Sequence, residues 1–410
     1  MTVFKVKQCS IVMMLLLALS STNILSAQEA NIENELSGFK FPIAKPNSNP
    51  WLQAVGETQF TVVWTTNVDA VVWVEVAPDD GTHFYAQERP KFYHSHYGRR
   101  VSGKLHRVPV TGLERGTKYR YRIFQQSVLQ DGGNKRMVLG DSYGSDILKK
   151  DPYTVTTLTP EKEEIKVSMV NDIHSNDDNF RKLLGNVLDN NTDFVVFNGD
   201  MLTQIETEEQ IFDGYLSSAS DLFASEIPFY ALRGNHEFRG VLSYEFFNYF
   251  PTLNNEAWFS FRHGPAYFIF LDSGEDKPDS DVRFYGLSQS DPFREREAEW
   301  LKEVVQKDEF KQAPIKIVFI HMPPSERGWH GTKEVERLFM PILNQAGVDL
   351  MLAGHLHRHI YISKGEDNNN FPILINSNTW RTDLSIDRSG IAVKLVDTSG
   401  KVMKEYLLKK

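Results

Sequence analysis

The sequence predicts an α/β domain preceded by an all-β sandwich, and three observations support this fold class. Apolar and polar residues alternate between about residues 51 and 157, as they do in half-buried strands. From residue 165 onwards, short apolar runs alternate with helical stretches, which is typical of an α/β sheet. Most of these runs end at an aspartate, asparagine or histidine, and such strand ends can converge in one ligand-binding crevice.

Residues 1–27 have the pattern of a cleaved secretory signal peptide. Lys5 and Lys7 precede an apolar stretch over 11–19, and small and polar residues continue to Ala27. A membrane anchor requires about 20 consecutive apolar residues, and the polar residues 20–23 end this stretch too early. We therefore expect an exported protein, periplasmic or secreted. Cleavage removes Cys9, the only cysteine, so the exported chain would have no disulfide.

The rest of the chain divides into three predicted segments. Residues 28–50 form an extended lead-in that is polar and interrupted by prolines. Residues 51–158 form the all-β domain, and residues 159–410 form the α/β domain, which begins at a charged joint over 160–164. Each domain is long enough to bury a core of its own. The α/β domain has predicted strands at 165–170, 194–197, 229–232, 315–320 and 350–352, and further strands at 258–261, 266–271 and within 373–402 are expected to complete a second sheet.

The residues that follow these strands are of the types that bind metal ions. Two adjacent divalent ions require oxygen and imidazole ligands from several strand ends, with one carboxylate in contact with both. Asp172 and His174 lie two residues apart, so an extended chain can direct both side chains toward one ion. Alone, such a pair is more often an ordinary strand end. Asp200 follows Gly199, which usually indicates a turn, yet a carboxylate here could bridge two ions.

Three further motifs complete the set. The amide oxygen of Asn235 suits a hard metal ion, and the adjacent His236 can point toward a substrate instead. His355 and His357 place two imidazoles on one side of an extended segment. His321 by itself would more commonly be a structural histidine at a strand end. The order of all the motifs along the chain favours one metal centre.

These motifs, in this order over residues 166–357, resemble those of the calcineurin-like metallophosphoesterase superfamily. The preceding domain resembles the N-terminal domain of purple acid phosphatases, and residues 106–121 are similar to a fibronectin type III strand pair with Tyr119 as the corner tyrosine. The resemblance implies two mixed sheets flanked by helices, and a metal-dependent phosphoric ester hydrolase with two divalent ions, Mn, Zn or Fe. It also implies a ligand set, in which one ion is held by Asp172, His174, Asp200 and His357, and the other by Asp200, Asn235, His321 and His355.

The resemblance further implies a mechanism, in which a metal-bound hydroxide attacks phosphorus in line and His236 is the catalytic residue that protonates the leaving oxygen. Purple acid phosphatases have glycine at the position of His174 and tyrosine at that of Thr203. This paired departure implies that the iron–tyrosinate colour is absent here.

An acid phosphatase-like phosphomonoesterase is the favoured function. A phosphodiesterase or nucleotidase of the same superfamily is the alternative, and a non-catalytic surface binding protein is the alternative of another class. A binding protein has no need for seven ligands together with His236. The formal charge of −9 favours a small phosphorylated substrate and argues against nucleic acid or stable membrane insertion, because partners of those kinds require a basic face or an apolar span. The oligomeric state is not indicated.

Four other residues have predicted positions. His94 and His96 alternate on a predicted strand without an accompanying acid, which predicts a surface pair. Trp329 lies in a glycine-flanked loop after His321, where it could line the substrate pocket or simply face solvent, and the neighbouring His330 has the same two interpretations.

Overall fold

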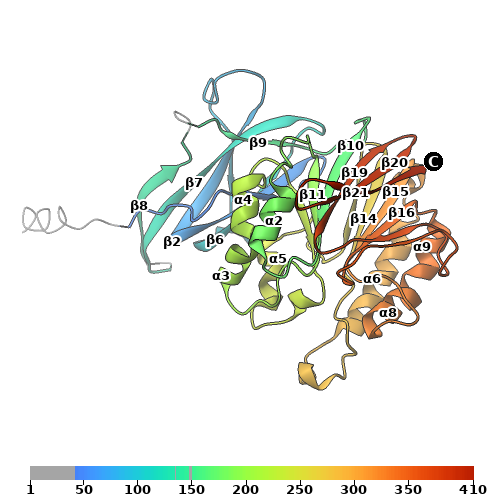
Figure 1. Cartoon of the computed structure of the whole chain (residues 1–410). Coiled ribbons are helices and arrows are strands. Elements are labelled where there is room, and N and C mark those ends of the chain that lie inside the picture. The colour runs from blue at the N-terminus through green and yellow to red at the C-terminus, as the bar shows by residue number, and fades with distance from the viewer. Residues whose placement is uncertain (1–41, 134, 147–149) are drawn as a thin grey trace, which may run out of the picture.

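The computed structural model of the chain describes residues 42–133, 135–146 and 150–410 (Figure 1). The predicted signal peptide and most of the predicted lead-in lie outside these residues. Within the described ranges, none of the helices combines the length and the apolar composition that crossing a bilayer requires.

Between residues 51 and 156, each regular element that the structure describes is a strand, as the alternating sequence predicts. The central strand β2 (Gln59–Pro78) is 20 residues long. Its first half pairs with β1 and β6 and its second half pairs with β7 and β3, so that this one strand joins both halves of the domain. These and the remaining strands are β1 (Trp51–Gln53), β3 (Lys91–Tyr93), β4 (Ser95–His96), β5 (Arg99–Arg100), β6 (Gly103–Thr111), β7 (Lys118–Asp131), β8 (Met137–Gly144) and β9 (Tyr153–Thr156).

Tyr119 and the histidines His94 and His96 of this domain can be compared with their predicted positions. The hydroxyl of Tyr119 accepts a hydrogen bond of 2.9 Å from the backbone N–H of Glu114, as a corner tyrosine does. The fibronectin type III assignment itself stays a prediction. His94 is buried against His106, with ring centroids 6.5 Å apart, whereas His96 is exposed. The predicted surface pair is therefore wrong for His94, because this side chain packs inward.

The α/β domain contains two six-stranded mixed sheets, and this confirms the predicted fold class. In the first sheet, β10, β11 and β12 are parallel and β10 continues antiparallel into β19, β20 and β21. Its strands are β10 (Ile165–Val170), β11 (Phe194–Asn198), β12 (Phe229–Leu232), β19 (Trp380–Asp387), β20 (Gly390–Asp397) and β21 (Val402–Lys409). The second sheet contains β13 (Phe259–His263), β14 (Ala266–Leu271), β15 (Ile315–Ile320), β16 (Leu350–Ala353), β17 (Ile360–Ile362) and β18 (Ile373–Ile375).

The two sheets stack face to face, and helices cover their outer faces (Figure 1). Strand β14 shows why: Phe268 and Phe270 belong to the core between the sheets, whereas Ile269 and Leu271 belong to the core under the helices. Such alternation is required when both faces of a strand are covered. The outer helices are α2 (Asp177–Leu184), α3 (Glu208–Ile211), η1 (Phe212–Leu216), α4 (Ser217–Leu222) and α5 (Phe246–Tyr249) on one side and α6 (Ser290–Val304), α7 (Asp308–Gln312), α8 (His330–Leu338) and α9 (Met340–Ala346) on the other.

The all-β domain and the first sheet share one continuous hydrophobic core instead of burying separate cores. Three buried aromatic side chains tie the domains together by donating to backbone carbonyls across the boundary. Trp51 Nε1 lies 2.9 Å from Tyr249 O, and the Tyr121 hydroxyl lies 2.7 Å from Ser225 O. The Tyr230 hydroxyl lies 2.7 Å from Val55 O. The two segments therefore form one packed unit, and the boundary between 158 and 159 stays a prediction.

Candidate metal centre

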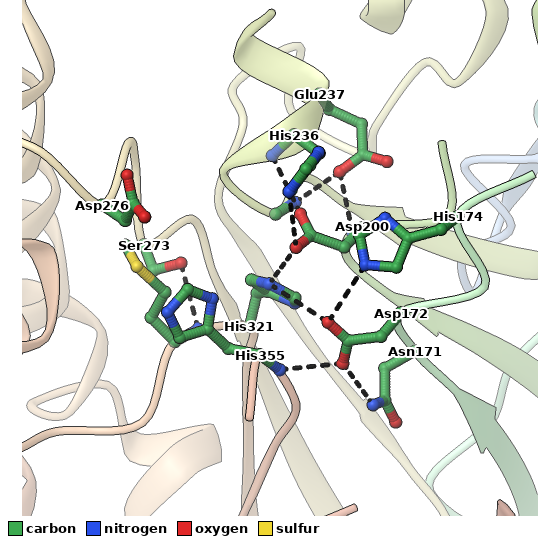
Figure 2. Close-up of polar contacts among 12 residues, drawn as sticks. Asn171, Asp172, His174, Asp200, His236, Glu237, Ser273, Asp276, His321 and His355 are labelled. Carbon is green, nitrogen blue, oxygen red and sulfur yellow. Dashed lines mark hydrogen bonds and ion pairs between the residues drawn. The ribbon is translucent and has the colours of Figure 1, made fainter. Parts of the chain in front are cut away.

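The structure brings all of the predicted site residues together at the carboxyl ends of five parallel strands. Both sheets contribute, since β10, β11 and β12 belong to the first and β15 and β16 to the second. Figure 2 shows side chains from both sheets pointing toward a common centre. In chain order the residues are Asp172 and His174 after β10, Asp200 after β11, Asn235 and His236 after β12, His321 after β15, and His355 and His357 after β16.

The backbone at these strand ends is strained. Five of the seven candidate ligands have a positive φ, between 49° and 70°, and these are Asp172, His174, Asp200, His355 and His357. For non-glycine residues this region costs on the order of 1–3 kcal/mol each, so it persists only where the surroundings enforce it. Here the loops fix one another, because Asp172 N donates to Gly199 O at 2.9 Å and His174 N donates to Asp200 O at 3.0 Å.

Two glycines let these loops approach closely. A Cβ atom at Gly234 would lie 2.1 Å from Asp200 Oδ1, and one at Gly354 would lie 2.8 Å from Asp172 Oδ2. Neither carboxylate can move aside, because Asp200 Oδ1 accepts from His236 N at 2.9 Å and Asp172 Oδ2 accepts from His355 N at 2.8 Å. Side chains at these glycines would therefore displace candidate ligands.

Asp172, His174 and His357 form the first cluster. Asp172 Oδ1 lies 3.2 Å from His357 Nε2 and 3.9 Å from His174 Nε2. The two imidazole nitrogens are 3.0 Å apart. Donor atoms of all three residues lie within 4.8 Å of one another, which is a spacing that a single metal ion can span.

Asp200, His321 and His355 form the second cluster. Asp200 Oδ2 lies 3.1 Å from His321 Nε2. The side-chain oxygen of Asn235 faces two acceptors, Asp200 Oδ2 at 3.3 Å and His355 Nδ1 at 3.0 Å. With the Asn235 oxygen in this position, three lone-pair atoms face one another, which is the arrangement that a cation site requires. If the amide were rotated, its NH₂ group would instead donate to both acceptors. Asp200 also groups with His174 and His236, so it lies between the two clusters, where the predicted bridging ligand belongs.

Unpaired buried atoms provide a test of whether these residues fit metal ions. Asp172 Oδ1, His321 Nε2 and His355 Nε2 are buried and form no well-directed hydrogen bond within the described part of the chain, although the first two lie at ion-pair distance from His357 and Asp200. Leaving such atoms unpaired costs about 1–3 kcal/mol each, and more for a charged group. Oxygen and imidazole donors of this kind are the ligands that Mn, Zn and Fe(II) accept, so the residues fit two divalent ions.

The electrostatics of the candidate ligands show that they attract positive charge. Burial would raise the pKa of Asp200, but the charge of His321 outweighs it and the pKa falls. Burial likewise opposes protonation of His321, yet Asp200 and then Asp172 raise its pKa to about 10. The two carboxylates therefore favour positive charge at this position, which a divalent ion bound by neutral imidazole would supply. Burial lowers the pKa of His355 to about 4, which leaves its lone pair free.

Glu237 supports the centre and was not identified from the sequence. Its carboxylate is fully buried and accepts hydrogen bonds from three backbone N–H groups, those of Asp200 at 2.8 Å, Leu202 at 3.0 Å and Gly234 at 2.7 Å. This one side chain therefore holds the loops after β11 and β12 together. Burial, followed by the charge of Asp200, raises the pKa of Glu237 to about 7. In the sequence, the signal for a role of Glu237 at the centre is its position directly after His236.

His236 and Arg239 lie at the edge of the centre. His236 Nδ1 lies 2.7 Å from Thr203 O, and since a carbonyl only accepts, this nitrogen carries the proton. Its Nε2 lies 4.0 Å from Asp200 Oδ2 and 3.1 Å from a guanidinium nitrogen of Arg239. Arg239, which the sequence analysis missed, is held in turn by the buried carboxylate of Glu275 at 3.1 Å.

The side chains of Trp329 and His330 have different neighbours in the structure. The half-exposed Trp329 ring packs edge-on against His355, with centroids 4.8 Å apart, so it borders the centre. His330 Nε2 instead lies 2.8 Å from Asp291 Oδ1, at the start of α6. Of the two, Trp329 is the one that contacts a candidate ligand.

A family model of calcineurin-like phosphoesterases matches residues 165–359, and these residues contain all of the candidate ligands. This segment, a little under half of the chain, is therefore similar to calcineurin-like phosphoesterases. Curated relatives are the serine/threonine-protein phosphatases CPPED1 of Mus musculus and Rattus norvegicus, each 24% identical over 188 residues. The matched region covers 44% of this chain and 56% of each relative, so the chain spans little more than half the length of these relatives.

Among solved structures, purple acid phosphatase PPD1 from yellow lupin (Lupinus luteus) seeds has a similar fold. The comparison covers 88% of this chain and 74% of that chain, with a TM-score of 0.58 and 15% sequence identity. At this identity the likeness concerns the fold alone. It extends beyond the phosphoesterase domain and therefore agrees with the predicted resemblance to purple acid phosphatases.

Proposed function

We propose that this protein is a metal-dependent phosphoric ester hydrolase, and that Asp172, His174, Asp200, Asn235, His321, His355 and His357 hold its two divalent ions. The observation that carries the proposal is the position of Asp200 between two clusters of oxygen and imidazole donors. A protein that only binds a partner has no need for buried, unpaired ligand atoms on strained strand ends.

The ions, when bound, would withdraw charge from the phosphoryl oxygens and supply a nucleophile at neutral pH. The chain's own residues then have distinct tasks. Glu237 keeps the loops of Asp200 and Gly234 in place, and Arg239 adds a positive charge beside the site. His236 is oriented by its Nδ1–H bond to Thr203 O, so that Nε2 is the atom that can carry a proton to the leaving oxygen.

A phosphomonoesterase is the favoured activity, and a phosphodiesterase or nucleotidase of the same superfamily is the alternative. The similarity to serine/threonine-protein phosphatases supports the first. We also propose that the protein is exported, since residues 1–27 have the pattern of a signal peptide. The acidic charge disfavours nucleic acid as substrate.

The test is hydrolysis by metal-stripped protein that is refilled separately with Mn, Zn, Fe or Ni. A panel of mono- and diesters ranks the substrates and the metals together, and stripped protein without added metal is the control. We expect monoester hydrolysis that returns with at least one metal. Protein that binds two ions but hydrolyses none of the esters would support the non-catalytic alternative.

A further inference from the structure

The guanidinium group of Arg239 is held in one orientation at the edge of the candidate metal centre. The Glu275 carboxylate binds two of its nitrogens, because Arg239 Nε lies 3.3 Å from Glu275 Oε2 and Nη2 lies 3.1 Å from Glu275 Oε1. Such a two-point pair fixes the plane of the guanidinium group. The third nitrogen, Nη1, takes no part in this pair and lies 3.1 Å from Nε2 of His236. The pair with Glu275 therefore places Nη1 beside the atom that is proposed to transfer a proton.

Both partners of this ion pair are themselves fixed. The backbone carbonyl of Arg239 accepts from Ile205 N at 2.8 Å, which ties it to the loop after β11. Glu275 is 1% exposed, its Oε1 accepts from Asp276 N at 2.9 Å, and its backbone carbonyl accepts from the buried guanidinium group of Arg294. The side chain of Arg239 is nevertheless 29% exposed. A small anion at the centre can therefore reach this guanidinium group.

Arg239 has more donors than its surroundings have acceptors. A guanidinium group has five N–H donors, and Glu275 accepts one from Nε and one from Nη2. Of the two N–H groups on Nη1, one can donate to the His236 ring through Nε2. The other finds no acceptor among the described residues apart from the same ring, whose Nδ1 already carries a proton. One donor on Nη1 is therefore available to a ligand.

Asn235 places a second donor at the same point. When its side-chain oxygen faces the metal position, its amide nitrogen lies 2.8 Å from Nη2 of Arg239. Two donors this close repel each other unless an acceptor lies beside both. Rotation of the amide would relieve the contact, but it would turn the oxygen away from the ions. An anionic oxygen next to the two nitrogens would accept from both and remove the conflict.

A purely structural ion pair is the alternative, and Arg233 shows how such a pair looks in this chain. Arg233 Nε lies 2.8 Å from Asp272 Oδ2, and its guanidinium group covers the ring of Phe238 at 3.9 Å from the centroid. Its charge is thus enclosed between a carboxylate and an aromatic face. Arg239 differs, because one of its nitrogens is directed at the His236 ring in the centre.

We propose that Arg239 is a substrate-binding residue that donates to a phosphoryl oxygen, and that Glu275 is the residue that positions it. This inference rests on the proposed phosphoester hydrolysis and names a residue that decides which esters are preferred. A phosphomonoester has three free oxygens and close to two negative charges at neutral pH, whereas a diester has two free oxygens and one charge. The donors of Arg239 and Asn235 suit the additional charged oxygen, which a diester carries in esterified form. Arg239 therefore favours monoesters over diesters.

The experiment compares two substrates that have the same leaving group. The metal-loaded full chain is assayed with p-nitrophenyl phosphate, a monoester, and with methyl p-nitrophenyl phosphate, in which a methyl group esterifies one more oxygen. We expect Arg239→Met to lower kcat/KM about 10- to 100-fold on the monoester and less than about threefold on the diester, since one hydrogen bond to a charged group has an effect of this size. Wild-type kcat/KM on the monoester, or an equal loss on both substrates, would overturn the inference.

Two further variants separate orientation from charge. Arg239→Lys keeps the positive charge but cannot form the two-point pair, so it should show most of the loss on the monoester. Glu275→Gln should change the ratio of monoester to diester kcat/KM in the same direction and by a smaller factor, because Arg239 stays but is held less firmly. An Arg239→Lys variant with the wild-type ratio would show that orientation is not what matters.

The matched control is Arg283→Met, which removes a positive charge from the loop that also carries Glu275. Arg283 pairs with Asp281 at 2.9 Å, and its side chain is 64% exposed. We expect this control to have the wild-type ratio of monoester to diester kcat/KM. A ratio in Glu275→Gln equal to that of the control would refute the positioning role of Glu275.

A binding measurement separates the failure of this inference from the failure of the proposed function. Calorimetric titration of the metal-loaded protein with methyl phosphate, at about pH 8 where this ligand is a dianion, reports recognition without turnover. We expect Arg239→Met to bind about tenfold or more weakly than Arg283→Met. A wild type that hydrolyses no ester would refute the proposed function, and this difference in affinity would still support Arg239. Equal affinity of the two variants would refute the inference.

Discussion

Asp200 is the residue on which the metal centre depends. Its Oδ2 lies 3.1 Å from His321 Nε2, and its Oδ1 fixes the backbone of His236. Because it lies between both clusters, we expect Asp200→Asn to lose bound metal as well as activity, since a neutral amide bridges two cations poorly. Metal analysis of the purified variant by mass spectrometry checks this. Full occupancy would show that Asp200 is not the bridge.

His236 has a different proposed role, which is to transfer a proton to the substrate and not to hold a metal ion. We expect His236→Ala to keep both ions and to lose roughly 10² to 10⁴ in turnover. The measurements are kcat and metal content on the same preparation, and Asp200→Asn serves as the comparison that loses both. Turnover within a few-fold of wild type at unchanged metal content would exclude the proposed role.

At the scale of elements, the loops after the strands set the geometry of the centre. Gly234, between β12 and His236, leaves no room for a side chain, because a Cβ atom would lie 2.1 Å from Asp200 Oδ1. We expect Gly234→Ala to weaken metal binding by displacing Asp200. The substitution should lower the thermal unfolding midpoint more in the metal-bound protein than in the metal-free protein. Gly103→Ala is the matched control, since a Cβ atom there meets no atom within 4 Å. Equal metal affinity in both variants would contradict this account.

Strand β6 carries a buried histidine whose titration should affect stability. Burial lowers the pKa of His106 to about 3, and burial followed by the charge of Arg107 lowers that of His94 to about 4. Unfolding restores the ordinary pKa of about 6.5, so the unfolded chain binds protons first as the pH falls. Stability should therefore decrease from about pH 6.5 down to about pH 4, by up to roughly 1.4 kcal/mol per pH unit for each histidine.

Urea unfolding at several pH values measures this dependence. The double variant His94→Gln with His106→Gln should show a shallower loss of stability in the same pH window, whatever its absolute stability. His96→Gln, at an exposed neighbour, should behave as the wild type. Identical slopes for the double variant and the wild type would show that these histidines do not titrate on unfolding.

Most elements and the candidate ligands could be predicted from the sequence because the signals are local. Each apolar run, such as that of β15, is short and ends directly before a polar residue such as His321. The contributions of Glu237 and Arg239 could not be predicted, because they depend on which distant backbone or carboxylate each side chain meets. The burial of His94 was missed for the same reason, since alternation indicates a strand but not which face is covered.

At the scale of the whole molecule, the shared core was also beyond prediction, because periodicity shows that Trp51 is buried but not against which element. Trp51 and Tyr121 donate to carbonyls of Tyr249 and Ser225 in the α/β domain. We expect residues 159–410 expressed alone to be insoluble or to unfold at a much lower temperature than the full chain. Light scattering and calorimetry check this, and an isolated domain with the stability of the full chain would contradict it.

The central claim is that side chains from two sheets hold a pair of ions at one site. The most direct measurement is the number of divalent ions per chain after the stripped protein is saturated and dialysed, made on the wild type, His236→Ala and Asp200→Asn. We predict two ions per chain in the first two proteins and fewer than one in the third. A wild type that binds no ion, or an Asp200→Asn variant that binds as many as the wild type, would contradict the account.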